Sequence, residues 1–127
     1  MIVAGIGCGR DTAAAEIVAL IDVALKQFDI ARDDLAALAT ESAKADEPCL
    51  IAAAHQLALP LLRCSVAELD AVEERLLTRS ERVRALKGTA SIAEAAALVG
   101  AGRDATLLGP RITSGRITCA IARGSDT

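Results

Sequence analysis

The chain has almost no aromatic side chains. Phe28 is the single aromatic residue among 127, and neither tryptophan nor tyrosine occurs, although 53% of the residues are hydrophobic. The core must therefore be built from alanine, leucine, isoleucine and valine, whose small size implies closely packed elements. Without aromatic stacking platforms, and with a net charge of −3, the chain is not expected to bind nucleic acid.

Long apolar runs and paired cysteines are also missing. No run approaches the roughly 20 apolar residues that span a bilayer, and the N-terminus starts with a strand pattern in place of a signal sequence. We therefore expect a cytoplasmic protein with no membrane partner. Cys8, Cys49, Cys64 and Cys119 form no Cys-x-x-Cys pair, so zinc-ribbon and thioredoxin-type sites are unsupported and reduced thiols are expected.

Several signatures of catalytic and cofactor sites are absent. The chain contains no Gly-Lys-Ser/Thr phosphate loop, no Gly-x-Ser-x-Gly elbow and no metal-ligand spacing. Its single histidine, His55, falls inside a helical segment and far from any nucleophile. Acyl-transfer triads and zinc hydrolysis are thus unsupported, and we expect neither a metal nor a cofactor.

The N-terminal segment has the pattern of a strand, a glycine turn and a helix. Residues 1–6 form an apolar, β-branched run typical of a buried strand, and Gly7-Cys8-Gly9-Arg10 breaks that run. Asp11 or Thr12 is the expected N-cap of a helix whose apolar face extends to Phe28. Because helix N-termini favour anionic groups and Arg10 adds a cation, this turn is a candidate ligand-binding loop.

Strand and helix patterns then alternate along the chain. Further strands are predicted at 35–40, 60–64 and 105–108, and a final, antiparallel strand at 117–121. Helices are predicted to begin at Pro48 and at two capping boxes, Ser65 with Glu68 and Ser91 with Glu94. A short helix is expected near 80–86, within a charged connector at 73–88.

This alternation predicts an α/β fold with a mostly parallel sheet of about five strands. We expect a single three-layer domain over residues 1–123, with helices on both faces of the sheet and an antiparallel C-terminal strand. Residues 124–127 are expected to be a frayed tail.

Three loops follow predicted strands at their carboxyl ends, where open α/β sheets bind ligands. These loops carry cations and hydroxyl groups although the whole protein is acidic, so an anionic ligand is expected. Asp46 or Glu47 alternatively caps the helix at Pro48, whereas Lys44 is not needed for capping. The expected ligand-binding residues are Gly7, Cys8, Gly9, Arg10, Thr12, Thr40, Lys44, Asp46, Arg111, Thr113, Ser114 and Gly115, with Arg116 in the same last loop.

Candidates for chemistry are fewer. A helix N-terminus and the adjacent Arg10 would both favour the thiolate of Cys8, although Cys8 is alternatively a small side chain fitted between glycines. Glu41, Asp46 and Glu47 are the available acids near the second loop. Cys8 and Glu47 are the catalytic candidates.

Four segments, taken in order, resemble the CobE family, which is similar to the C-terminal domain of CbiG. The match spans nearly the whole chain. Gly9 and Asp11 stand where a Cys-Arg-Arg-Gly run is more usual, and Gly109-Pro110-Arg111 replaces a Val-Pro-Lys type of entry, but both loops keep a cation. The segments are Gly5–Arg10 with Thr12, Ala39–Thr40 with Lys44–Pro48, Ser91–Leu98, and Ser114–Gly115 leading into Thr118–Ala122.

The resemblance implies a compact α/β domain with a role in building the corrin ring of cobalamin. One hypothesis is that the chain binds an acidic corrinoid or precorrin intermediate, or presents it to a pathway enzyme, through Arg10, Lys44, Arg111 and Ser114. The alternative is a hydrolase that opens the δ-lactone of a precorrin-5A-type intermediate, as CbiG-like proteins do. A third hypothesis is a structural partner of other corrin-pathway enzymes.

Overall fold

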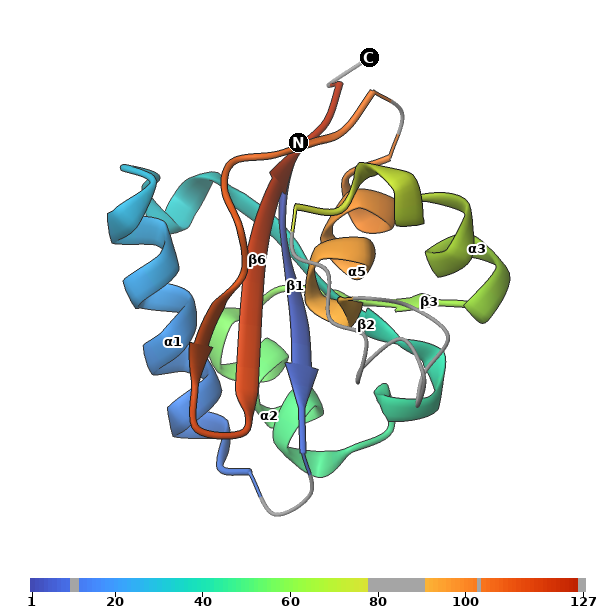
Figure 1. Cartoon of the computed structure of the whole chain (residues 1–127). Helices are drawn as coiled ribbons and strands as arrows, with labels where there is room; N and C mark the ends of the chain where they lie inside the picture. Colours follow the sequence, from blue (N-terminus) through green and yellow to red (C-terminus); the bar gives the residue numbers. More distant parts are fainter. Residues whose placement is uncertain (10–11, 78–90, 103, 126–127) are drawn as a thin grey trace.

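The computed structural model describes residues 1–9, 12–77, 91–102 and 104–125 (Figure 1). Arg10, Asp11 and the helix expected at 80–86 lie outside these residues. The described strands are β1 (Ile2–Cys8), β2 (Leu35–Glu41), β3 (Leu61–Cys64), β4 (Thr106–Leu107), β5 (Ile112–Ser114) and β6 (Ile117–Arg123). The described α-helices are α1 (Ala14–Gln27), α2 (Pro48–Leu57), α3 (Val66–Ala71) and α5 (Ile92–Ala101).

The strands form one six-stranded sheet in the order β3-β2-β1-β6-β4, with β5 also paired to β6. β1, β2 and β3 are parallel, whereas β6 runs antiparallel to β1, β4 and β5. This arrangement confirms the predicted α/β fold and its antiparallel C-terminal strand. The additional strand is β5, a polar segment expected to be a loop, which pairs with β6 through Ile112–Cys119 and Ser114–Ile117.

Helices cover both faces of the sheet and make three layers. α1 and α2 bury their apolar sides against Ile6, Leu38 and Ile121 on one face. α5 and α3 cover the opposite face, where the strands present Val3 and a row of alanines (Figure 1). Side chains of successive strand residues point to opposite faces, so each strand contributes to both cores.

α5 lies in direct contact with the backbone of β1. A Cβ atom added at Gly5 would lie 2.0 Å from the carbonyl oxygen of Ala93 and 2.5 Å from the amide nitrogen of Ala97. Only a residue without a side chain permits this approach. The alanine-rich sequence of α5 therefore brings the helix close to the sheet, as the lack of aromatic residues implied.

The ends of the helices partly follow the predicted capping. The Ser65–Glu68 capping box of α3 is confirmed, with both reciprocal bonds present. At α5 the Ser91 hydroxyl accepts a hydrogen bond from the Glu94 amide at 3.3 Å. The Thr12 cap of α1 is wrong, because the Thr12 hydroxyl donates to the Gly9 carbonyl at 2.8 Å and Ala13 occupies the N-cap without a side-chain bond.

The two described ends of the chain meet beside the sheet. The amide of Gly124 donates to the Met1 carbonyl at 2.8 Å, and the Met1 amino group donates to the Gly124 carbonyl at 3.2 Å. Of the tail expected at 124–127, residues 126–127 lie outside the described residues. Within the described part of the chain, no helix has the length and apolar character needed to cross a membrane.

Candidate functional site

The first and last predicted loops meet at one end of the sheet. Because β6 is antiparallel to β1, the last residue of β1, Cys8, pairs with the first residue of β6, Ile117. The amide of Gly9 donates to the Arg116 carbonyl at 3.1 Å. The Gly-Cys turn and the Ser-Gly turn are therefore neighbours, although most of the sequence separates them.

A two-residue turn, Gly115-Arg116, connects β5 to β6. Gly115 has φ of +59°, a left-handed conformation that glycine adopts without strain at the first position of such hairpin loops. The Arg116 side chain covers Gly9, since a Cβ added there would lie 3.2 Å from Arg116 Cδ. The hairpin thus projects polar and cationic groups past the end of β1.

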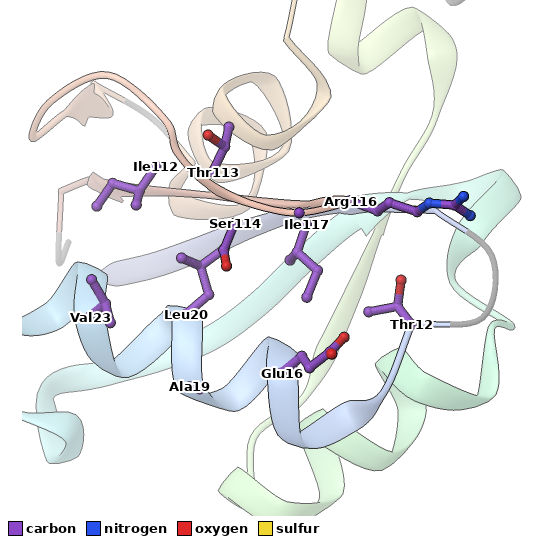
Figure 2. A pocket seen from close by; sticks show the side chains of 11 residues that line it. Thr12, Glu16, Ala19, Leu20, Val23, Ile112, Thr113, Ser114, Arg116 and Ile117 are labelled. Carbon is purple, nitrogen blue, oxygen red and sulfur yellow. The ribbon is translucent and has the colours of Figure 1, made fainter.

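A groove of about 610 Å³ lies between this hairpin and α1 (Figure 2). Ile112 and Val23 lie at one end of it, and Thr12, Glu16 and Arg116 lie at the other (Figure 2). Leu20 and Ile117, both buried core residues, contribute apolar surface between the ends. The lining residues are Thr12, Glu16, Ala19, Leu20, Val23, Ile112, Thr113, Ser114, Gly115, Arg116 and Ile117.

The groove contains four residues predicted to bind ligand and several that were missed. Thr12, Thr113, Ser114 and Gly115 were expected, whereas the contribution of α1 was not. Glu16, Ala19, Leu20 and Val23 follow the spacing of one helix stripe. Val23 is the structural mark of this stripe, because it is an apolar side chain of α1 that is 52% exposed.

A second group of predicted residues gathers between the end of β1 and the start of α2. Lys44 Nζ lies 3.9 Å from Glu47 Oε1, with 22% and 31% of their side chains exposed. Cys8 lies near this pair and near Cys49, since all three neighbours affect the pKa of its thiol. None of these four residues lines the groove beside α1. The expected gathering of all three loops in one cleft is therefore wrong for the second loop, which shares the end of the sheet but not that groove.

The surroundings of Cys8 do not activate its thiol. Burial, followed by the neighbouring Cys49 and Glu47, raises the pKa of Cys8 to about 12, and the opposing effect of Lys44 is smaller. Cys8 is thus a neutral thiol at pH 7. The expectation of a stabilised thiolate at this position is wrong, because desolvation penalises the charged form.

Several predicted site residues make contacts within the fold. The fully buried Thr40 hydroxyl donates to the Ile6 carbonyl at 2.8 Å and joins β2 to β1. Gly7 packs against Thr118, since a Cβ atom added at Gly7 would lie 2.6 Å from the Thr118 hydroxyl oxygen. Asp46 forms an exposed ion pair with Arg63 at 2.5 Å, and Arg63 lowers the pKa of the Asp46 carboxyl.

The alternative capping role of Asp46 or Glu47 is also absent at α2. Glu47 stands at the N-cap position, but its side chain makes no capping bond. Asp46 instead reaches Arg63 on β3. Pro48 occupies the start of the helix as predicted, where its missing amide hydrogen removes one unpaired donor.

Glu94 is a buried acid whose partners the sequence analysis missed. Its side chain is fully buried, and its two oxygens accept hydrogen bonds from the Leu77 amide at 2.9 Å and the Arg111 amide at 2.8 Å. Arg111 therefore meets this acid through its backbone, at the start of β5. In the sequence, Glu94 stands out as an acidic residue among the alanines of α5. The predicted capping box with Ser91 already accounted for it, so no buried partners were expected.

The described residues contain no group of three or more histidine, cysteine or acidic side chains that could hold a metal ion. The described site offers groups for recognition by charge and hydrogen bonds, and Lys44 and Glu47 are ionisable side chains that lie near Cys8.

The fold is a three-layer α/β domain in which a C-terminal hairpin lies beside the first helix. The chain belongs to the family described as "Cobalamin synthesis G C-terminus", whose model matches residues 2–122. It is thus a cobalamin biosynthesis protein of the CobE and CbiG C-terminal type, as the sequence resemblance indicated.

Individual relatives agree with this assignment. The chain is 43% identical over 121 residues to Protein CobE of Sinorhizobium sp, covering 95% of this chain and 79% of that protein. A crystal structure of CobE, a protein from the cobalamin biosynthetic pathway, matches with a TM-score of 0.91 and 37% identity, over 97% of this chain and 89% of that one. The chain is also 30% identical to a cobalt-precorrin-5A hydrolase of Priestia megaterium, over 93% of this chain but 31% of the hydrolase.

Proposed function

We propose that the chain binds an acidic corrinoid intermediate at the end of the sheet where β1 stops and the β5–β6 hairpin turns. The observation that carries this proposal is the groove between α1 and the hairpin, with apolar walls and a polar end. A corrin precursor has the matching chemistry, since it is an apolar macrocycle edged by carboxylates. The family assignment supports the same ligand class.

The hairpin side of the groove supplies the donors for such carboxylates. The hydroxyls of Thr113 and Ser114 and the guanidinium of Arg116 lie on exposed positions of the hairpin. Charge-assisted hydrogen bonds contribute about 1.5–3 kcal/mol each when partly desolvated. Glu16 disfavours a carboxylate beside α1, so the acids of the ligand are expected to face the hairpin.

The size of the groove fits part of a macrocycle. Its volume of about 610 Å³ lies within the range of roughly 300–1,000 Å³ that is usual for small-molecule sites. Lys44, at the same end of the sheet, is the side chain that we expect to meet a carboxylate extending past β1. Arg10 remains a predicted contact.

The test is a visible-absorption titration of the whole chain with cobyrinic acid, which carries free carboxylates. Cobinamide, in which these carboxylates are amides, is the matched ligand control. We expect the acid to bind more tightly, and Arg116→Ala to weaken its binding by about tenfold, equivalent to about 1.4 kcal/mol. Equal binding of the two ligands would contradict the proposal.

Arg123→Ala is the matched protein control. Arg123 is also exposed, but it lies at the far end of β6, beside Met1 and Asp34. Its loss changes the net charge as much as the loss of Arg116. Affinity for cobyrinic acid should therefore remain unchanged in Arg123→Ala, and an equal loss in both variants would reduce the interaction to net charge alone.

A second candidate function is hydrolysis of a precorrin-5A-type lactone. The specific observation in its favour is the 30% identity to a cobalt-precorrin-5A hydrolase, combined with the Lys44–Glu47 pair beside Cys8. Because the Cys8 thiol is neutral, Glu47 is the stronger candidate for proton transfer. CbiG-like proteins release acetaldehyde when they open this lactone, so incubation of the chain with the lactone should release acetaldehyde too. Glu47→Gln should abolish this release, while Cys8→Ser retains it.

A further inference from the structure

The groove beside α1 carries opposite charges on its two walls. Glu16 lies in the first turn of α1, and Arg116 lies in the turn of the β5–β6 hairpin. Figure 2 shows both residues at the same end of the groove. Both are exposed, and neither takes part in an ion pair among the described residues. A ligand in the groove therefore meets a carboxylate on one wall and a guanidinium on the other.

The position of Glu16 on α1 turns it toward the groove. Glu16, Leu20 and Val23 follow the i, i+4, i+7 spacing that places side chains along one side of a helix, and all three line the groove. Glu16 lies at the polar end and Val23 at the apolar end (Figure 2). A macrocycle whose apolar surface covers Leu20 and Val23 thus brings one of its edges to Glu16.

We propose that Glu16 is a specificity-determining residue of this groove, which selects a corrinoid with amides on the edge beside α1 and free carboxylates on the edge beside the hairpin. This inference rests on the proposed corrinoid function and specifies its ligand. An amide N–H group can donate to the Glu16 carboxylate, whereas a ligand carboxylate has no donor and is repelled. Arg116 has the opposite preference, because a guanidinium only donates hydrogen bonds.

Glu16 has a second role that must be separated from this one. An acid in the first turn of a helix stabilises the positive end of the helix dipole. That role affects the stability of α1 but not the choice between two ligands. Specificity is a difference between two affinities, so the ratio of affinities for an acid and for its amide reports on the proposed role alone.

The experiment titrates the whole chain with cobyrinic acid and with cobyrinic acid a,c-diamide, in which amides replace some of the carboxylates, and follows visible absorption. We expect the unchanged chain to prefer the diamide. Glu16→Gln should bind cobyrinic acid about threefold more tightly and the diamide about threefold more weakly, since solvent screens an exposed charge. A gain in affinity for cobyrinic acid cannot result from a failure to fold.

Asp33→Asn is the matched control, because it removes the same charge from another exposed residue. Asp33 comes just before β2, whose first residue, Leu35, pairs with Ile2 at the opposite end of the sheet from the groove. The ratio of the two affinities should therefore stay unchanged in Asp33→Asn. An equal change of the ratio in both variants would overturn the role of Glu16, since net charge would explain it.

The outcomes also separate this inference from the proposed function. If cobyrinic acid binds and Arg116→Ala weakens it, but Glu16→Gln leaves the ratio of affinities unchanged, the role of Glu16 is overturned while the corrinoid function stands. A preference of the unchanged chain for cobyrinic acid over the diamide overturns the role of Glu16 as well. Binding of neither ligand overturns both proposals.

Discussion

The two faces of the sheet are packed by different means. Under α5 the strands present Val3, Ala37, Ala39, Ala120 and Ala122, so backbone and helix meet almost directly. Under α1 and α2 they present larger side chains such as Ile6 and Leu38, and a groove opens at the margin of that layer, beside the hairpin. Small residues make a close contact without free space, whereas large residues make a thicker layer whose edge can receive a ligand.

The largest expected effect tests the close contact. Gly5→Ala places a Cβ 2.0 Å from the Ala93 carbonyl oxygen, and neither backbone can move aside without displacing α5. We expect a loss of about 4 kcal/mol in the free energy of unfolding, measured by urea denaturation. Gly9→Ala is the matched control, since its Cβ would meet the flexible Arg116 side chain, and it should cost less than about 1 kcal/mol.

Truncating a buried side chain on the opposite face of the sheet should lower the free energy of unfolding somewhat less than Gly5→Ala does. Ile21 is fully buried on α1, and Ile21→Ala removes three carbon atoms and leaves a cavity, with an expected loss of about 3 kcal/mol. Val23→Ala on the same helix is the control. Because Val23 is 52% exposed, its truncation should cost less than about 1 kcal/mol in the same denaturation measurement.

Glu94→Gln tests the buried acid on the α5 face. The amide that replaces one carboxylate oxygen cannot accept a hydrogen bond, so either the Leu77 or the Arg111 amide loses its acceptor. We expect a loss of about 2 kcal/mol in the free energy of unfolding. Glu16→Gln, at an exposed position of α1, should change stability by less than about 0.5 kcal/mol. An equally small change in Glu94→Gln would contradict the supporting role of the carboxylate.

The smallest expected effect compares the starts of α3 and α2. Ser65→Ala removes the capping box of α3 and should cost about 1 kcal/mol. Glu47→Ala at the N-cap of α2, which has no side-chain cap, should cost less than about 0.5 kcal/mol. Similar losses of unfolding free energy in both variants would show that the side-chain bonds of the capping box do not stabilise α3.

The capping box also makes a pH-dependent contribution. Hydrogen bonds from Ser65 lower the pKa of the Glu68 carboxyl in the folded chain. The resulting stability is fully present above the pKa of Glu68 in the unfolded chain, and it is lost as the pH falls through the lowered folded value. The Ser65 backbone amide, the larger cause, is retained in Ser65→Ala, whereas the hydroxyl is lost. NMR titration should therefore find the Glu68 pKa raised only part of the way to its ordinary value, and an unshifted titration would show that the hydroxyl contributes nothing.

Much of the fold was predictable because its signals are local. Alternating strand and helix patterns, Pro48 at a helix start and the Ser65–Glu68 box each depend on residues a few positions apart. Thr113 and Ser114 show the limit. They look like loop residues, yet they form β5 because β6 offers them an unpaired edge.

The candidate site was predicted less completely for the same reason. The loops with positive charge and hydroxyls were recognised, and the antiparallel pairing of β6 with β1 brings the first and last of them together. Thr40, Gly7 and Asp46 stay predicted site residues, and in the structure they make a backbone hydrogen bond, a packing contact and a surface ion pair respectively. Residue type alone does not distinguish a side chain that meets a ligand from one that meets its own backbone.

The sequence by itself determined the layers and the small-residue core, because composition and periodicity decide which faces are buried. The family was indicated separately, by the resemblance of four sequence segments. Only the tertiary structure decided that Glu94 accepts hydrogen bonds from the amides of Leu77 and Arg111, and that α1 forms a groove with the hairpin. These contacts depend on strand order and on the approach of distant segments. Both arise from the packing of the whole chain, which no local pattern encodes.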